Sequence, residues 1–337
     1  MHVLITGGSG FLGLRLAREL LARGKIALAG AAPQPLARLT LTDRIAPPAE
    51  VLADPRVASL PGDLLSLAQT GGLPTSAVDL IVHLAAAVSA ECEADFDLGM
   101  RSNLDTMRGL LEYARHQSVP PVVVFASSVA VFGDPLGRPF QKTVTDETLP
   151  TPQNSYGIQK FIGEQLMADY GRKGFIRARS LRLMTVSVRP GRPNGAASGF
   201  LSGMIREPLA GVACRVPVPP ETPVALASPG NTIAGILRAI TASDTEWGPR
   251  TAVNLPSVCV TVQEMAATLQ RIAGPEVAAR LQWSVDPTVA RVVGGWPSRF
   301  QTDRAHALGL LPDADFAAIV RDYIAENPGA VSSTVHG

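Results

Sequence analysis

A glycine-rich turn near the N-terminus constrains the fold of this chain more than any other feature. The apolar run at residues 3–6 leads directly into glycines at positions 7, 8, 10 and 13. Residues 11–23 then carry apolar side chains at the three- and four-residue spacing of a helix. A buried strand, a glycine turn and a helix in this order are typical of the first βα unit of a parallel sheet.

The glycines of such a turn have separate tasks. Gly7 permits the tight turn, Gly10 lets the backbone approach a pyrophosphate, and Gly13 lets the helix and the strand pack closely. The helix N-terminus, at Phe11 and Leu12, offers free N–H groups to the anion. The spacing is G-x-x-G-x-x-G rather than G-x-G-x-x-G, and a lone glycine pattern is weak evidence. Between a strand and a helix, however, it predicts dinucleotide binding rather than a merely structural turn.

The second strand of such a unit ends in an acidic residue that binds the adenosine ribose hydroxyls. Asp43 follows the apolar run at residues 39–42, although it lies farther from the glycines than the usual ~20 residues. The rival second strand, residues 26–29, has no acid at its end, so we favour Asp43 and treat residues 24–36 as an enlarged loop. A carboxylate there repels a 2′-phosphate and favours NAD over NADP, although the neighbouring Arg44 weakens this preference.

Asp63 and Leu64 follow the third predicted strand, within the sequence Pro-Gly-Asp-Leu. A carboxylate at this place can meet the adenine of the dinucleotide. Asp63 also suits a simple turn, so that alternative stays open.

The N-terminal half continues to alternate strands and helices. Strands are predicted at residues 39–42, 80–82 and 122–125, and helices at about 95–117 and 154–172. Buried strands that alternate with helices form a parallel sheet covered on both faces. We therefore predict an α/β fold with a Rossmann-type doubly wound parallel sheet.

Proline and glycine become dense between residues 190 and 229, which predicts irregular structure with short elements. Helices at about 232–242 and 261–273 follow. We predict a smaller, irregular C-terminal cap that binds substrate over the edge of the sheet. The predicted division is an NAD-binding domain at 1–186, to which about 225–258 return, the cap at 187–224 and 259–330, and a loose tail at 331–337.

Tyr156 and Lys160 lie one helical turn apart on one face of the helix predicted at 154–172. A nearby ammonium favours the phenolate and lowers the pKa of a tyrosine toward working pH, which suits a catalytic base. Ser128 closes the strand predicted at 122–125. Because ligands of open parallel sheets bind outside the carboxyl ends of the strands, the glycine turn, Ser128 and Tyr156 are predicted to meet there. The alternative is a buried tyrosine with an exposed lysine.

These residues resemble the extended short-chain dehydrogenase/reductases, the NAD-dependent epimerase/dehydratase group. The resemblance is carried by residues 6–13, by Leu84, Ala85 and Ala86, by Ser127 and Ser128, and by Tyr156 with Lys160. In that family the site serine stands five residues before a glycine, and Gly133 thus indicates Ser128 rather than Ser127.

The resemblance implies a role for each residue. Tyr156 takes the proton of the substrate hydroxyl, and Ser128 hydrogen-bonds the same oxygen. Lys160 holds the nicotinamide ribose of NAD, and Leu84, Ala85 and Ala86 belong to the cofactor site. Asn103 resembles the asparagine that helps some members to hold a proton-relay water.

A narrower resemblance is to the D-erythronate dehydrogenase family, which the chain is similar to from Met1 to about Leu311. It is carried by residues 154–161, 181–183, 188–194, 205–211 and 294–297. It implies that NAD oxidises the C2 hydroxyl of a four-carbon sugar acid to a 2-keto acid. The family has proline after the Arg-Leu pair, where this chain has Met184, so the shape of the pocket and the exact substrate stay open.

A hydroxy acid needs a cationic anchor for its carboxylate. Arg189 and Arg192 lie in the predicted cap and could bind the acid in bidentate fashion, and Asn194 and Ser198 could bind its hydroxyls. Solvated or structural roles are open for each of them. Trp296 suits packing better than a pocket wall. His83 suits the core better than a ligand site.

Three other functions stay open. The first is a nucleotide-sugar epimerase or dehydratase with tightly held NAD. The second is a dehydrogenase of another aldonic or hydroxy acid. The third is a non-catalytic NAD-binding module, which the intact Ser128, Tyr156 and Lys160 disfavour.

The composition excludes several other classes. The net charge of +1 gives no reason to expect a nucleic acid or an acidic membrane as partner. No apolar run approaches the ~20 residues that span a bilayer, and the first residues lack a secretory pattern. Three distant cysteines suit a reducing compartment and form no metal motif, so we expect no metal and a cytoplasmic protein. A homodimer could form through the helices at 95–117 and 154–172.

Overall fold

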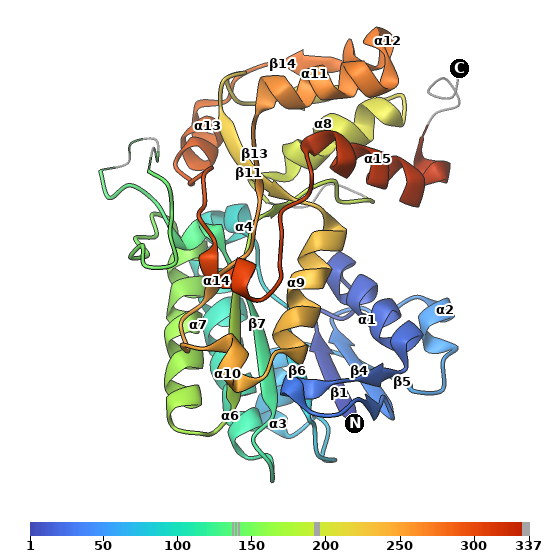
Figure 1. Cartoon of the computed structure of the whole chain (residues 1–337), viewed down its shortest axis with the longest axis vertical. Coiled ribbons are helices and arrows are strands. Elements are labelled where there is room, and N and C mark those ends of the chain that lie inside the picture. The colour runs from blue at the N-terminus through green and yellow to red at the C-terminus, as the bar shows by residue number, and fades with distance from the viewer. Residues whose placement is uncertain (137, 139, 141, 192–195, 332–337) are drawn as a thin grey trace. The chain divides into compact units, whose positions relative to one another are not determined.

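The computed structural model describes residues 1–136, 138, 140, 142–191 and 196–331 (Figure 1). The chain forms two compact units. The first comprises Met1–Ser128, Asn154–Arg182 and Ile233–Val253, and the second comprises Val129–Gln153, Leu183–Thr232 and Asn254–Gly337.

The observed division is more interleaved than the predicted one. Residues 129–153, which we assigned to the first domain, belong to the second unit. The segment that returns to the first unit is Ile233–Val253, shorter than the predicted 225–258. These differences arise because unit boundaries depend on contacts between distant segments, which local sequence patterns do not encode. Of the predicted tail, residues 332–337 lie outside the described residues.

The first unit is built on a seven-stranded sheet with the order β12-β8-β7-β6-β1-β4-β5. The pairs β1–β4, β4–β5, β1–β6 and β6–β7 are parallel. The order runs outward in both directions from β1, as in a doubly wound Rossmann sheet, which confirms the predicted fold class. The strands are β1 (His2–Thr6), β4 (Arg38–Asp43), β5 (Val57–Pro61), β6 (Leu80–His83), β7 (Val122–Ser128), β8 (Arg177–Leu183) and β12 (Val253–Asn254).

The predicted second strand is confirmed. Leu39–Thr42 lie within β4, and Leu4 of β1 is in register with Thr40 on one side and Ile81 of β6 on the other. The rival segment instead begins a short hairpin in which β2 (Lys25–Ile26) pairs antiparallel with β3 (Gln34–Pro35) around a 3-10 turn, η1 (Leu28–Gly30). Residues 24–36 are therefore the enlarged loop that we expected.

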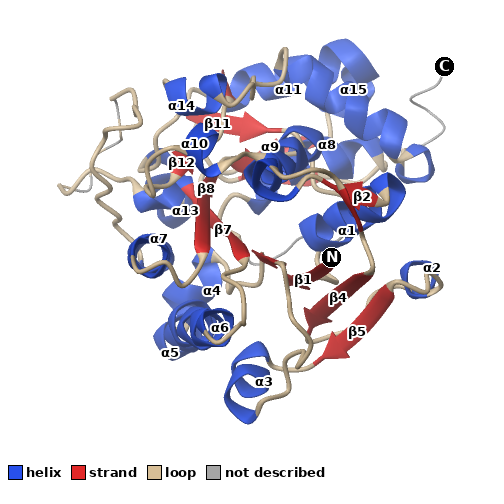
Figure 2. Cartoon of the chain, turned by 60° about the horizontal axis from the view of Figure 1, so that its bottom comes forward, coloured by secondary structure: helices blue, strands red, loops and turns tan. Residues whose placement is uncertain are grey.

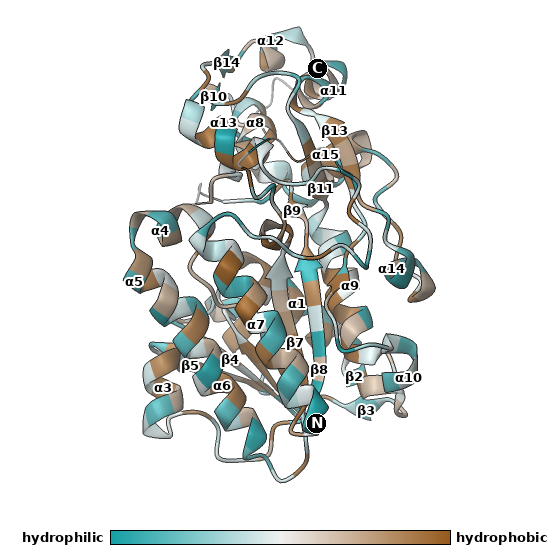
Figure 3. Cartoon of the chain, turned by 90° about the vertical axis from the view of Figure 1, so that its left-hand side faces the viewer, coloured by the Kyte–Doolittle hydropathy of each residue, from teal (hydrophilic) through white to brown (hydrophobic). Residues whose placement is uncertain are grey.

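Helices cover both faces of this sheet (Figure 2). One face is covered by α3, α6 and α7, and the other by α1 and α9. Apolar side chains from the sheet, such as Leu4 and Phe125, pack against Met107, Leu110 and Met167 of the helices. Polar and apolar residues share α6 and α7 (Figure 3), so these helices bury one side and expose the other. The helices are α1 (Phe11–Arg23), α2 (Ala49–Leu52), α3 (Leu64–Thr70), α4 (Ser89–Ala94), α5 (Phe96–Gly99), α6 (Thr106–Arg115), α7 (Ser155–Arg172), α9 (Pro229–Thr241) and α10 (Asp244–Trp247).

The helix predicted at 95–117 is interrupted in the middle. Between α5 and α6 the chain forms one π-helical stretch, η2 (Met100–Asp105), which contains Asn103. Such wide turns are rare in proteins, and many of those that are known lie at functional sites.

The second unit is more regular than we predicted. The proline-rich segment contains α8 (Gly199–Leu209), whose apolar residues Leu201, Met204, Ile205 and Leu209 are buried. The unit also holds two small sheets, β13-β11-β9 and β10-β14. Its strands are β9 (Thr185–Val186), β10 (Cys214–Val216), β11 (Pro223–Ala227), β13 (Val258–Thr261) and β14 (Leu281–Trp283). Its other helices are η3 (Val129–Val131), α11 (Val262–Ala273), α12 (Pro275–Ala278), α13 (Pro287–Gly294), α14 (Asp303–Ala307), α15 (Phe316–Glu326) and η4 (Pro328–Ala330).

None of the helices in the described ranges combines the length and apolar character that crossing a bilayer requires.

Candidate active site

The glycine turn has the geometry that a phosphate cradle needs. Gly7 has a φ of +69°, and the Gly10 N–H donates to the Gly7 carbonyl at 3.1 Å. A β-carbon at Gly13 would lie 2.2 Å from the Gly7 carbonyl oxygen. The first hydrogen bond of α1 runs from the Leu14 N–H to the Gly10 carbonyl, so the preceding N–H groups at the helix start have no helical acceptor. The turn thus fits a dinucleotide pyrophosphate.

Leu84, Ala85 and Ala86 follow β6 and lie beside this turn. A β-carbon at Gly7 would approach the Ala85 backbone nitrogen to 2.8 Å, so only glycine allows the two segments to lie this close. His83, the last residue of β6, is buried and its Nδ1 lies 2.7 Å from the Thr6 hydroxyl. Burial lowers the pKa of His83 to about 3, so the ring is neutral. This agrees with the prediction of a core histidine.

Asp43 ends β4 next to the glycine turn. Its Oδ2 accepts a hydrogen bond from the Ser9 N–H at 3.1 Å, and its Oδ1 accepts from the Arg44 N–H at 2.7 Å. The structure thus places the predicted ribose-binding carboxylate at the mouth of the cradle. Its contact with the cofactor stays a prediction.

Asp43→Asn is expected to weaken NAD binding by about 10-fold, because hydrogen bonds to a charged group contribute more than neutral ones. NADP binding should weaken less, since the substitution also removes the repulsion of a 2′-phosphate. Calorimetric titration with both dinucleotides measures the two affinities. Asp169→Asn, which removes an exposed carboxylate of α7 that pairs with Arg172, is the control. Unchanged NAD affinity in Asp43→Asn would reject the assignment.

Asp63 has a structural task in this fold. It caps α3, because its Oδ1 accepts from the Ser66 N–H at 2.9 Å, and it lies 3.1 Å from Arg101 Nη2. The hydrogen bond from the Ser66 backbone is the main cause that lowers the pKa of Asp63. Asp63 therefore has the local structural role that the turn alternative described. Contacts of Asp63 and Leu64 with adenine stay predictions.

Asn103 lies in a buried polar network. Its Oδ1 accepts from the Ala87 N–H at 2.8 Å, and its Nδ2 lies 2.8 Å from Gln159 Oε1, to which it donates. Nδ2 also reaches the Ala87 carbonyl and Cys92 Sγ. Asn103 thus ties the segment after β6 to α7, and its link to a proton-relay water stays a prediction.

The structure distinguishes the two serines at the end of β7. Ser127 is buried, and its hydroxyl donates to Glu164 Oε1 at 2.6 Å. Ser128 is the last residue of the strand and is only partly buried. Because the Ser127 hydroxyl is committed to a core carboxylate, the geometry favours Ser128 as the site serine.

Tyr156 and Lys160 lie at the start of α7, which Asn154 caps by accepting from the Gly157 N–H at 2.7 Å. Lys160 Nζ lies 5.7 Å from the centroid of the Tyr156 ring and donates to the Ala126 carbonyl at 2.8 Å. The lysine side chain is buried, and this burial lowers the pKa of Lys160 to about 8, against smaller raising effects of Cys92 and Glu164.

These contacts bring the end of β7 and the first turns of α7 together. A phenol lies beside an ammonium that is fixed to the strand carrying Ser128. Such a group can take a proton from a substrate hydroxyl while a serine hydroxyl stabilises the oxygen. The sequence analysis did not identify Ala126 as the hydrogen-bond partner of Lys160. The one sequence feature that pointed to Ala126 was its place at the end of the predicted strand, two residues before Ser128.

Of the four substrate residues predicted in the cap, two, Arg192 and Asn194, lie outside the described residues. Arg189 is partly buried, and its backbone is fixed by Ser202 Oγ at 3.0 Å and by Arg206 at 2.7 Å. Ser198 is buried directly before α8. Their contacts with substrate stay predictions.

Trp296 has both of the roles that were weighed for it: it packs against the core of the second unit and it lines a cavity there. The cavity is also lined by Val129, Thr185 and Leu201. Its buried Nε1 has no hydrogen-bond acceptor among the described residues. The cavity wall includes the residue that directly follows Ser128 in the chain.

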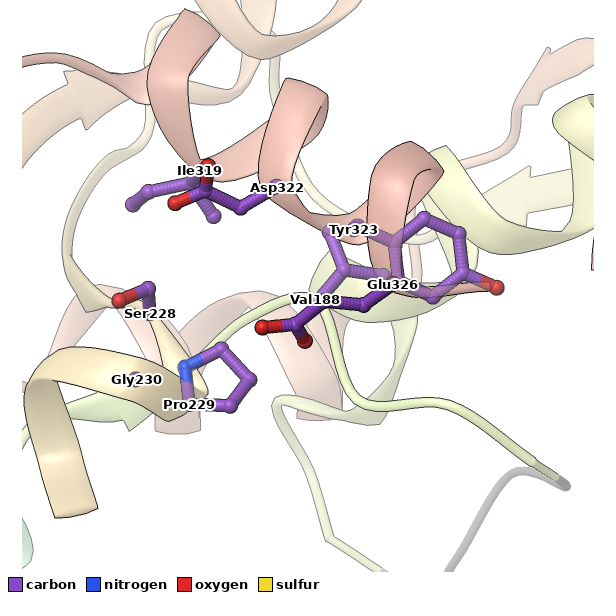
Figure 4. Close-up of a pocket in the computed structure, with 8 residues that line it drawn as sticks. All are labelled: Val188, Ser228, Pro229, Gly230, Ile319, Asp322, Tyr323 and Glu326. Carbon is purple, nitrogen blue, oxygen red and sulfur yellow. The ribbon is translucent and has the colours of Figure 1, made fainter. Parts of the chain in front are cut away.

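A second cavity of this unit has acidic walls. In Figure 4 the carboxylates of Asp322 and Glu326 extend toward Ser228 and Pro229, whereas the Tyr323 hydroxyl points away. Carboxylates repel an acid, so this cavity does not suit a sugar acid. Within the part of the chain that the structure describes, no cluster of histidine, cysteine, aspartate or glutamate could hold a metal ion.

Comparison with known proteins agrees with this geometry. Residues 3–232 match the model of the NAD dependent epimerase/dehydratase family. The chain is 49% identical over 96% of its length to a D-erythronate dehydrogenase of Cupriavidus necator, of which the match covers 98%. It is 37% identical, over 96% of the chain and 99% of the relative, to a D-erythronate dehydrogenase of Haemophilus influenzae.

A solved structure resembles the whole chain. It is described as a nucleoside-diphosphate-sugar epimerase from Agrobacterium tumefaciens and is 35% identical. The match covers 98% of this chain and 95% of that one, with a TM-score of 0.87.

Proposed function

Because the chain belongs to the NAD-dependent epimerase/dehydratase family, we propose that it is a dehydrogenase that oxidises the C2 hydroxyl of D-erythronate with NAD. The observation that carries this proposal is the 49% identity to a D-erythronate dehydrogenase over nearly the whole chain. The intact Ser128, Tyr156 and Lys160 support an active enzyme rather than a non-catalytic NAD-binding module.

The chain's residues fit the cofactor of the family. The turn at Gly7, Gly10 and Gly13 leaves room that β-carbons would fill, and the start of α1 at Phe11 and Leu12 presents N–H groups to a pyrophosphate. Asp43 would bind the adenosine ribose, and Lys160 would bind the nicotinamide ribose. When bound, NAD supplies the hydride acceptor.

Tyr156 acts in this proposal as the base that takes the C2 hydroxyl proton. The Lys160 ammonium stabilises the resulting phenolate because it is buried and lies 5.7 Å from the centroid of the Tyr156 ring. Ser128 donates to the same substrate oxygen and orients it. Arg189 and Arg192 anchor the carboxylate, and Asn194 and Ser198 bind the remaining hydroxyls.

The proposal includes a cytoplasmic location and a homodimer that uses the exposed sides of α6 and α7. Both remain predictions from the sequence.

The test is a spectrophotometric assay for NADH at 340 nm with D-erythronate, its C2 and C3 epimers, and UDP-sugars. The proposal expects sustained NADH formation with D-erythronate and none with UDP-sugars. An epimerase, which the Agrobacterium structure suggests as the second candidate, would convert a UDP-sugar without net NADH. Preference for another aldonic acid would keep the chemistry and correct the substrate.

A further inference from the structure

A buried charge network lies behind the candidate active site. The Ser127 hydroxyl donates to Glu164 Oε1 at 2.6 Å, and Arg182 makes two bonds to the same carboxylate, Nε to Oε1 at 2.9 Å and Nη2 to Oε2 at 2.7 Å. All three residues are at most 5% exposed. They come from β7, α7 and β8, so one carboxylate connects two strands and a helix.

Glu164 lies on the same face of α7 as the proposed catalytic residues. Tyr156, Lys160 and Glu164 follow one another at four-residue spacing, which places them along one face of α7. Consecutive residues of β7 hold the last two: the Ala126 carbonyl accepts from Lys160, and the Ser127 hydroxyl donates to Glu164. The bond that holds the Lys160 ammonium therefore adjoins a second bond between α7 and β7, the one from Ser127 to Glu164.

The charged and titratable groups around Lys160 are few. Cys92 of α4 and Glu164 of α7 act on it electrostatically, His83 of β6 is neutral, and Tyr156 is the proposed base. Glu164 is the carboxylate among these groups, and together with Cys92 it partly offsets the loss of water around the ammonium. Arg182 balances the carboxylate in turn.

Stability alone is a weak reason for such a network. Replacing a buried ion pair with well-packed apolar side chains is often neutral or stabilising, because both charges lose their hydration. The Glu164 carboxylate is held by three hydrogen bonds one helical turn from Lys160. An electrostatic effect of this fixed negative charge on Lys160 therefore explains the network better than stability does.

We propose that Glu164 is a positioning residue of the active site: held by Ser127 and Arg182, it fixes Lys160 beside the end of β7 and keeps its amine charged. This inference rests on the proposed function, in which the Lys160 charge assists Tyr156.

The chain has only four lysines, at positions 25, 142, 160 and 173, so their charge states can be followed individually. Protein labelled with 13C at the lysine ε-carbon is titrated by NMR, and the Lys160 signal is the one missing from Lys160→Arg. In the wild type we expect Lys160 to titrate near its lowered pKa of about 8.

The two partners of the buried pair should then act in opposite directions. Glu164→Gln leaves an uncompensated positive charge and should lower the Lys160 pKa by about one unit. Arg182→Gln leaves an uncompensated negative charge and should raise it by about one unit. The double variant should return close to the wild-type value. A network that does not act on the Lys160 charge predicts no such reversal of sign, so shifts in one direction, or none, would overturn the proposal.

Arg179→Gln is the matched control. Arg179 is also a buried, ion-paired arginine of β8, but its partner is Asp244. Its loss should lower the melting temperature and leave the Lys160 titration unchanged. If one of the two single variants does not fold, the other still tests the proposal, because the direction of its Lys160 pKa shift is predicted separately.

Ser127→Ala is the mildest variant and tests the positioning part. It removes one hydrogen bond to Glu164 and keeps both charges, so the Lys160 pKa should stay within a few tenths of a unit while kcat falls several-fold. Unchanged kcat would contradict positioning. The titrations need no substrate, so they succeed or fail independently of the proposed reaction, which Tyr156→Phe tests.

Discussion

Tyr156→Phe should lower kcat for D-erythronate oxidation by about 10²–10⁴-fold, the range that a general base contributes. The substitution removes one oxygen and keeps the ring that lies 5.7 Å from the Lys160 amine. Packing should therefore persist, and NAD affinity should stay within about two-fold of the wild-type value. Stopped-flow or steady-state formation of NADH measures the first quantity, and calorimetric titration measures the second.

Tyr170→Phe is the control from the same helix. The Tyr170 hydroxyl donates to Glu112, and burial raises the pKa of Tyr170 to about 12, so this phenol stays protonated at neutral pH and cannot take a proton. Its loss should leave kcat nearly unchanged. Residual activity of Tyr156→Phe above a tenth of the wild-type rate would mean that another group takes the proton.

Gly13→Ala should have the largest effect on the cofactor site. The added methyl would lie 2.2 Å from the Gly7 carbonyl oxygen and 2.8 Å from the Gly8 α-carbon, and backbone cannot move aside as a side chain can. We expect a loss of up to about 3 kcal/mol in the free energy of unfolding and no detectable NAD binding. Thermal unfolding with and without NAD measures both.

Gly10→Ala separates the two effects. Its β-carbon would meet only the Gly7 carbonyl oxygen, at 3.2 Å, so the melting temperature of the free protein should change little. The methyl would instead occupy the space that the pyrophosphate needs. Loss of the NAD-induced thermal shift is therefore expected. Gly294→Ala, where nothing lies within 4 Å of the new atom, should resemble the wild type in both measurements. Normal NAD binding by Gly10→Ala would contradict the cradle.

The first unit was largely predictable because its signals are local. Apolar runs marked β4, β6 and β7, and the glycine turn marked the start of α1. The correct second strand followed from the acid at its end, Asp43, although residues 26–29 are also apolar. The choice of Ser128 over Ser127 came from a family spacing, and the structure supports it through the bond between Ser127 and Glu164.

The second unit was less predictable. Proline and glycine suggested irregular structure, yet Pro208 lies in the last turn of α8 and does not prevent that helix. The apolar spacing of Leu201, Met204, Ile205 and Leu209 was the signal for it. The network around Glu164 could not be predicted at all. Its three residues are distant in sequence and meet only because α7 packs against β7 and β8.

The bond between Lys160 and the Ala126 carbonyl makes the sheet itself the support of the ammonium that we propose to assist Tyr156. A side chain tied to the main chain of a central strand cannot swing to suit a different ligand, so its place is as constant as the strand's. Changes among the apolar residues of β7 would therefore disturb turnover, even without touching any ligand. Directed evolution toward other sugar acids should accordingly succeed through substitutions in the second unit and fail through those in β7.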